Sequence, residues 1–284
     1  IKNRDFSGNS GQAIKNSIYQ FLTSMISKGG SFIFTIVLAR LLMPELFGIY
    51  SLAITILLFL VTISDLGFGG SITRFLAESL GNKDKKQARS RLWFLMKNKF
   101  LIAVLFSIVL FFSSGLIADF FKKPELVLVL RVGSLYLFIS SIYLIINPIF
   151  LSIQKLKYSS ISEIIFQASR FFLVFFLFYL IKFPINIQVI FMLIILSMGI
   201  SLIVMVVIIL KKYSFLVEGE TEPVERRRIL KFSGIIGLSA FGILIFNNID
   251  KIILGYFLSS DFLGYYAAIM TVISGVMGVL SIGG

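Results

Sequence analysis

The sequence predicts an all-α integral membrane protein, and three observations support this fold class. Of the 284 residues, 57% are hydrophobic and only 14% are charged, whereas soluble domains average about 45–50% apolar and about 25% charged residues. The mean hydropathy is +0.96. The apolar residues also fall in long uninterrupted runs such as 187–210, which are unlike the strands of about ten alternating residues in a membrane β-barrel.

A membrane-spanning helix needs about 20 predominantly apolar residues, and charged or Pro- and Gly-containing stretches mark its ends. On this criterion we expect seven complete spans and the start of an eighth. They run over residues 17–41, 49–70, 92–117, 126–151, 161–181, 187–210, 232–258 and 264–284. Because the chain starts without a methionine and stops inside an apolar run, we expect it to be a fragment of a longer protein.

The distribution of basic residues predicts the orientation of these spans. The chain has 27 Lys and Arg against 14 Asp and Glu, a net charge of +13. Segments on one side hold 19 of the 27, the opposite side holds 4, and 4 lie within spans. The 19 include Lys2 and Arg4 of the N-terminal arm and Arg91 and Lys99 of the loop region between spans 2 and 3. Since cytoplasmic loops carry the excess of Lys and Arg, we expect a cytoplasmic N-terminus. The charge is then a topology signal, and we expect no nucleic-acid partner.

The composition excludes several kinds of chemistry. The chain has no Cys and no His, so disulfides, thiol nucleophiles, His-ligated metal sites and Ser-His-Asp triads are ruled out. The carboxylates are dispersed, and the glycines of Gly67-Phe-Gly-Gly70 lack the Lys and the preceding strand of a phosphate-binding loop. We therefore expect no catalytic residues, no metal site and no cofactor.

An internal repeat appears at a constant offset of 216 residues. The segment Leu42–Tyr50 (LMPELFGIY) matches Leu258–Tyr266 (LSSDFLGYY). The pairs that carry the match are Lys15/Lys231, Ser17/Ser233, Glu45/Asp261, Gly48/Gly264 and Tyr50/Tyr266, and Thr55/Thr271 also matches. Six spans separate the copies, so both enter the membrane in the same sense, and parallel repeats of this kind are typical of transporters with a site between two halves.

The repeat predicts the domain organisation. Residues 1–212 form a first six-helix lobe, 213–225 form a cytoplasmic inter-lobe linker, and 226–284 form the start of a second lobe with spans 7 and 8. The fold class is thus two parallel-repeat six-helix lobes, of which the second is truncated and about eight helices are present.

Polar residues inside span 1 form the first candidate site. Ser24, Ser27, Lys28, Ser31 and Thr35 are spaced by three and four residues and lie on one helical stripe. A charge at mid-bilayer costs about 2.5–3.5 kcal/mol on insertion scales, and Lys28 lies roughly 16 Å into its span. A water-filled cleft accounts for this stripe. The alternative is that the hydroxyls bond back to their own helix and Lys28 extends to the interface.

Span 7 contains Asn247, Asn248, Asp250 and Lys251, the most polar cluster in any span. Because spans 1 and 7 are repeat equivalents, both polar faces can meet at the lobe interface. The alternative is that this cluster lies near the outer end of its helix and is simply hydrated.

Span 5 offers Glu163, Gln167 and Arg170 on one helical face. The structural explanation is an intra-lobe network in which a carboxylate satisfies Arg170, and the alternative is a binding site inside the first lobe. Asp65, at the inner end of span 2, is expected to be a solvated helix-end carboxylate.

The motif stretches 38–53 (LARLLMPELFGIYSLA), 65–69 (DLGFG) and 73–78 (TRFLAE) resemble the start of the polysaccharide transporter, or Wzx-like oligosaccharide flippase, family. The stretches 248–255 (NIDKIILG) and 264–268 (GYYAA) resemble the start of that family's second lobe. The family belongs to the multidrug/oligosaccharidyl-lipid/polysaccharide exporter superfamily. The resemblance implies twelve or more helices in two lobes around a central cleft, and the flipping of lipid-linked oligosaccharide across the cytoplasmic (plasma) membrane.

If this resemblance holds, the substrate carries an anionic polyprenyl phosphate or pyrophosphate, and the other partner is membrane lipid. Lys28 and Lys251 are the candidates for binding that anion, and Asn247, Asn248 and the span 1 hydroxyls, Ser24 and Ser31 among them, for binding sugar. Asp250 or Glu163 could couple proton or cation movement. The alternatives are a cation-coupled multidrug or metabolite exporter of the same superfamily, a membrane-embedded glycosyltransferase or polymerase, and a non-transporting scaffold.

Overall fold

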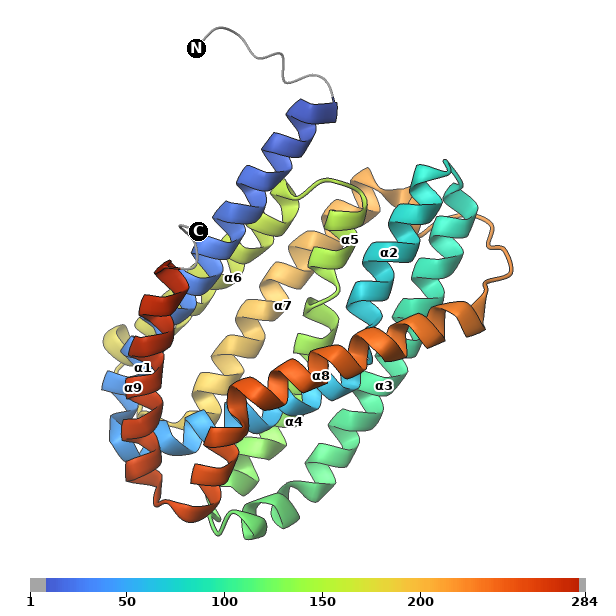
Figure 1. The fold of residues 1–284 in the computed structure, drawn as a ribbon. Coiled ribbons are helices and arrows are strands. Elements are labelled where there is room, and N and C mark those ends of the chain that lie inside the picture. The colour runs from blue at the N-terminus through green and yellow to red at the C-terminus, as the bar shows by residue number, and fades with distance from the viewer. Residues whose placement is uncertain (1–8, 281–284) are drawn as a thin grey trace, which may run out of the picture.

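The computed structural model describes residues 9–280 as a bundle of long helices (Figure 1). The helices are α1 (Asn9–Asp65), α2 (Phe68–Gly81), α3 (Lys85–Phe120), α4 (Leu126–Tyr143), α5 (Ile146–Ser152), α6 (Lys157–Phe175), α7 (Ile187–Lys212), α8 (Arg226–Phe257) and α9 (Ser260–Leu280). A π-helical turn, Phe176–Leu180, continues α6, and a 3-10 turn, Ser214–Leu216, follows α7. Lys2, Arg4 and residues 281–284 lie outside the described residues.

The expected all-α membrane fold class is confirmed. Within residues 9–280, six helical stretches are long and apolar enough to cross a membrane. The first of them, Ile14–Gly81, contains both of the first two expected spans. The large apolar side chains on the outside of the bundle, such as Phe112 with 79% exposure, are those that lipid would cover.

The connection between the first two spans is shorter than the interval, residues 42–48, that separates the expected spans 17–41 and 49–70. The helix α1 has 57 residues, or about 85 Å at 1.5 Å per residue, almost three times the hydrocarbon thickness of about 30 Å. It turns back at Met43, whose backbone is not helical (φ 60°, ψ 168°), and Pro44 follows. Since Pro lacks an N–H group and has a fixed φ, the helix restarts there directly, and one residue replaces the loop.

Two other expected spans are interrupted for related reasons. Span 2 ends at Asp65 and not at residue 70, because Leu66 and Gly67 adopt left-handed conformations (φ 45° and 73°). Span 4 is divided at Leu144 and Ile145 into α4 and α5. Pro148 explains this division, since its ring clashes with the carbonyl group four residues earlier in a continuous helix.

Repeat-equivalent segments meet where α9 packs along α1 (Figure 1). A Cβ atom at Gly48 would overlap the carbonyl oxygen of Ser260, and a Cβ atom at Gly264 would overlap that of Pro44. The two contacts are equivalent, because the 216-residue offset relates Pro44 to Ser260 and Gly48 to Gly264. The glycines therefore permit a close crossing of equivalent helices at the ends nearest Met43 and Leu258.

A charged cluster attaches the start of α8 to α2 and α3. Arg91 is 2% exposed and donates to both carboxylate oxygens of Glu225 at 3.1 Å and to Glu78 at 3.4 Å. Arg228 donates to the two oxygens of Glu78 at 3.2 and 3.1 Å. Arg91 of α3, expected to be a loop cation, is thus buried against α2 and the segment before α8.

The Glu225 contact predicts a pH dependence. Desolvation raises the pKa of Glu225, but the hydrogen bond from Arg91 and the charges of Arg91 and Arg228 outweigh it and hold this pKa below its ordinary value. A carboxylate with a depressed folded-state pKa stabilises the protein above its unfolded-state pKa of about 4.3 and loses this effect as the pH falls through the folded-state value.

We therefore expect Glu225→Gln to lower the Tm at pH 7 and to have no effect at the acid end, below the folded-state pKa. The measurement is thermal unfolding of the purified chain between pH 7 and pH 3. Glu218→Gln, at an exposed carboxylate of the same segment, is the control and should leave the Tm unchanged throughout. An equal decrease at every pH would show that the Glu225 charge does not contribute.

Candidate functional site

A cavity of about 500 Å³ lies between α1, α8 and α9, and we call it the α1/α8/α9 cavity. Its polar lining consists of two lysines and four hydroxyl groups. The lysines are Lys28 of α1 and Lys251 of α8, and the hydroxyl residues are Ser31, Thr35, Thr271 and Ser274. The structure therefore brings part of the polar stripe of the first span (Lys28, Ser31 and Thr35) and a lysine of the seventh together at one cavity.

The depth of this cavity follows from helix geometry. Lys28 lies fifteen residues and Thr35 eight residues before the Met43 turn, which places them about 22 Å and about 12 Å along α1 from that turn. Both positions fall within a hydrocarbon layer about 30 Å thick. Thr35 and Lys251 are also repeat equivalents at the 216-residue offset. The cavity thus places cationic side chains at membrane depth, where they are costly without an anion or water.

A second cavity, of about 370 Å³, lies inside the first group of helices, and we call it the α1/α6 cavity. Ser24, Ser27 and Lys28 line it from α1, and Glu163 lines it from α6. Lys28 thus borders both cavities, whereas the other residues of the stripe divide between them. Thr35 also donates to the carbonyl oxygen of Ser31 at 2.8 Å, so back-bonding and cavity lining occur together at this position.

The three polar residues of the fifth expected span are connected, but not as expected. Arg170 donates to the side-chain oxygen of Gln167, and Gln167 Nε2 donates to Glu163 Oε1 at 2.6 Å. Gln167 therefore stands between the guanidinium and the carboxylate that was expected to satisfy it. The Arg170 guanidinium lies 4.0 Å from the centre of the Phe34 ring, a contact with α1 that sequence spacing does not reveal.

The polar cluster of α8 divides in the structure. Lys251 lines the α1/α8/α9 cavity, but Asn247, Asn248 and Asp250 are not among the residues that line it. Asp250 accepts a hydrogen bond from the Tyr266 hydroxyl of α9, and Asn248 donates to the carbonyl oxygen of Leu244 at 3.2 Å. Asn247 is exposed. Asp250 and Asn248 therefore have contacts with α9 and with their own helix.

Sequence reasoning missed three residues. Thr271 and Ser274 line the cavity from α9, and the repeat match of Thr271 with Thr55 was the available signal. The third is Lys99, a 1% exposed side chain that forms an ion pair with Asp65. Asp65 is therefore not the solvated carboxylate we expected. The reason is that α3 begins at Lys85, which places Lys99 well inside a helix and against the end of α1.

A bundle of membrane-spanning helices with a polar cavity at membrane depth, bordered by repeat-related helices, has the architecture of a multi-pass transporter. Two solved structures share this fold. One is a MATE in complex with Br-NRF, with a TM-score of 0.65 and 15% identity, over 98% of this chain and 70% of that one. The other is the inward-facing conformation of a multidrug resistance MATE family transporter of the MOP superfamily, with a TM-score of 0.58 and 15% identity, over 94% of this chain and 60% of that one.

A comparison of the sequence with protein families identifies the family of this chain. The model of the polysaccharide biosynthesis protein family matches residues 13–282, and the chain belongs to this family. No curated protein matches the chain significantly. The resemblance to the polysaccharide transporter family, drawn from the motifs at residues 38–53 and 248–255, is thereby confirmed.

Proposed function

We propose that this chain belongs to a transporter that flips lipid-linked oligosaccharide across the cytoplasmic membrane by alternating access. The single observation that carries the proposal is that Lys28 and Lys251, from repeat-equivalent helices, line one cavity at membrane depth. Membership of the polysaccharide biosynthesis family supports the substrate class. In this proposal residues 1–212 are the first lobe, 213–225 are a cytoplasmic linker, 226–284 begin the second lobe, and the N-terminus is cytoplasmic.

The chemistry of the cavity fits an anionic, hydroxyl-rich substrate. A polyprenyl phosphate or pyrophosphate loses hydration when it leaves the membrane surface, and two ammonium groups in a medium of low dielectric offset that cost. The hydroxyls of Ser31, Thr271 and Ser274 are suited to bind sugar hydroxyls. The same lysines repel the cationic substrates of a drug exporter, so the cavity favours the oligosaccharide carrier.

Of the two carboxylates considered for ion coupling, Glu163 is the better placed. It lines the α1/α6 cavity together with Lys28, so a change in its protonation would act on a lysine that also borders the α1/α8/α9 cavity. Asp250 instead holds the Tyr266 hydroxyl and is not part of either lining. We therefore assign the coupling role to Glu163 and a positioning role between α8 and α9 to Asp250.

The flipping of a fluorescent lipid-linked oligosaccharide by the full-length protein in liposomes tests the proposal. Hydrogen bonds to charged groups contribute about 1.5–3 kcal/mol, so we expect Lys28→Ala and Lys251→Ala each to slow flipping by at least about tenfold. Lys97→Ala, at an exposed lysine of α3, is the matched control and should flip normally. Undiminished flipping by the double variant would overturn the roles of both lysines, and transport of a cationic drug in their place would favour an exporter.

A further inference from the structure

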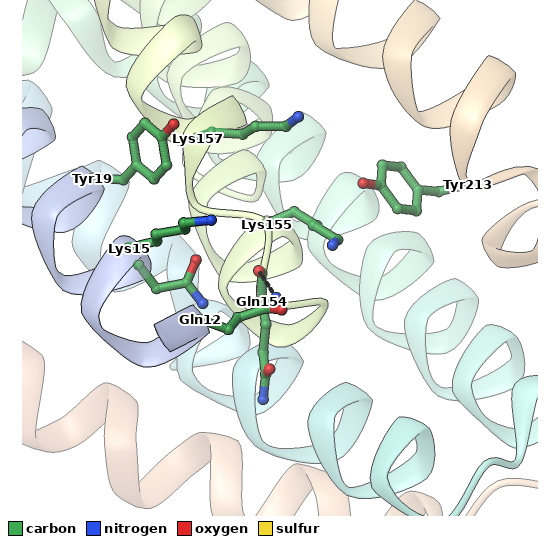
Figure 2. Close-up of a pocket in the computed structure, with 8 residues that line it drawn as sticks. Gln12, Lys15, Tyr19, Gln154, Lys155, Lys157 and Tyr213 are labelled. Atoms are coloured by element: carbon green, nitrogen blue, oxygen red, sulfur yellow. Dashed lines mark hydrogen bonds between the residues drawn. The ribbon is translucent and has the colours of Figure 1, made fainter. Parts of the chain in front are cut away.

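A further pocket with a basic lining shares no lining residue with the two cavities described above, and Figure 2 shows it. It has a volume of about 420 Å³. Lys15 enters it from α1, Lys155 enters it from the segment that joins α5 to α6, and Lys157 enters it as the first residue of α6. Across the pocket, the hydroxyl group of Tyr213 points toward Lys155 (Figure 2).

The first turns of α1 are attached to the rim of this pocket. Gln12 Nε2 donates to the carbonyl oxygen of Gln154 at 3.2 Å, which is the dashed line in Figure 2. Tyr19, one turn after Lys15 on α1, lies on the side of Lys157 (Figure 2). The three lysines therefore surround a polar space whose walls come from three separate parts of the chain: α1, the start of α6 with the segment before it, and Tyr213 after α7.

The electrostatics of this pocket favour an anion. None of the residues that line it is acidic, and within residues 9–280 neither Lys155 nor Lys157 forms an ion pair with a carboxylate. The helix α6 begins at Lys157, and no side chain caps it. Since the positive end of a helix dipole disfavours nearby cations and attracts anions, the helix adds to the charge of the lysines.

Tyr213 adds a neutral hydrogen-bond donor to this arrangement. Burial and the neighbouring hydroxyl of Tyr158 raise the pKa of Tyr213 to about 12. Its hydroxyl therefore keeps its proton at physiological pH. A phosphate oxygen accepts hydrogen bonds from hydroxyl and ammonium groups alike.

We propose that this pocket, with Lys15, Lys155 and Lys157 as its ligands, is a binding site for a phosphate group, either in the headgroup of an anionic membrane lipid or in a soluble phosphoanion. Lys15 lies thirteen residues from Lys28, or about 20 Å along α1, so the site is separate from the cavity of the proposed transport function. The residues that line the pocket come from the N-terminal arm and from the loop regions after spans 4 and 6, which the distribution of basic residues predicts to be cytoplasmic. Anionic lipid on that side attracts clustered lysines.

The test measures binding to the purified full-length protein by native mass spectrometry. The probes are phosphatidylglycerol, phosphatidylcholine and inorganic phosphate. Because each lysine near an anionic surface accounts for about fivefold in affinity, we expect the variant with Lys15→Gln, Lys155→Gln and Lys157→Gln to bind phosphatidylglycerol roughly 100-fold more weakly. Phosphatidylcholine, which has no net charge, should bind equally to both proteins.

The matched control removes the same charge elsewhere, by Lys83→Gln, Lys97→Gln and Lys211→Gln at exposed lysines. It should retain phosphatidylglycerol binding. Unchanged thermal unfolding of both triple variants would show that a loss of binding is not caused by unfolding. A second variant, Lys155→Glu with Lys157→Glu, should abolish the binding without altering the fold, because both side chains are exposed.

Three outcomes decide the proposal. Loss of phosphatidylglycerol binding in the pocket variants alone establishes a lipid headgroup site, and lysine-dependent binding of inorganic phosphate alone establishes a site for a soluble phosphoanion. An equal loss in the control, or no loss in the pocket variants, overturns the site. The readout is binding and not flipping, so this proposal and the transport proposal fail independently.

Discussion

Asp65→Asn should destabilise the protein by about 3 kcal/mol, because it removes the partner of a buried charge. The Lys99 side chain is 1% exposed and the Asp65 side chain 25% exposed, and the two form an ion pair. Removing one member of a buried ion pair costs about 3–5 kcal/mol, because the remaining charge is left uncompensated. The partial exposure of Asp65 places the expected value at the lower end of that range.

The measurement is thermal unfolding in detergent at constant pH. Asp119→Asn makes the same change at an exposed carboxylate in the last turn of α3. This control should leave the midpoint of thermal unfolding unchanged. The double variant Asp65→Asn with Lys99→Met should recover much of the loss, since it leaves no buried charge without a partner. A double variant as unstable as the single one would show that the ammonium group of Lys99 is not the source of the cost.

The second large effect is expected at the crossing of α1 and α9. Alanine at Gly48 would place its Cβ atom on the carbonyl oxygen of Ser260 and 2.9 Å from the amide nitrogen of Gly264. These are backbone atoms, which cannot rotate away as a side chain can, so the helices must separate. Overpacking of this kind costs about 1–3 kcal/mol, and Gly264→Ala should have a similar effect through Pro44.

The two substitutions should not add. Both widen the same crossing, so the double variant should cost clearly less than the sum of the single variants. Because the chain has no Cys, spin labels on Leu46→Cys and Phe262→Cys, which are repeat equivalents, can report the separation of the two helices.

Gly199→Ala is the matched control for the crossing. A Cβ atom at Gly199 meets no atom within 4 Å, and alanine is the better helix former by about 1 kcal/mol. It should therefore be neutral or stabilising and leave the label separation unchanged. An unchanged separation in Gly48→Ala as well would contradict the close crossing.

Much of the fold can be predicted from the sequence, because membrane spans depend on local composition. The helix α7 (Ile187–Lys212) begins at the first residue of the expected span 187–210 and ends two residues after it. The agreement arises because polar residues border that apolar run on both sides. The break in α1 at Met43 could not be predicted in the same way. Whether a Pro-containing stretch forms a loop or a sharp turn depends on what packs against it.

The candidate site shows the same division. Lys28 and Lys251 could be identified because a charge inside an apolar run is rare and costly, and the repeat indicated that their helices meet. The sequence could not show that Asn247 and Asn248 lie outside the cavity, although they precede Lys251 by only a few residues. Their directions are decided by the rotation of α8 against α1 and α9.

By itself, the sequence determined the membrane environment, the family and the parallel repeat, because hydropathy and residue matches are properties of short segments. Only the tertiary structure decided which charges belong together. The sequence predicts Lys99 and Arg91 as loop cations, yet both are buried against carboxylates from other segments of the chain. Electrostatic partners act over a few ångströms in space, and that proximity arises when helices distant in the chain pack together.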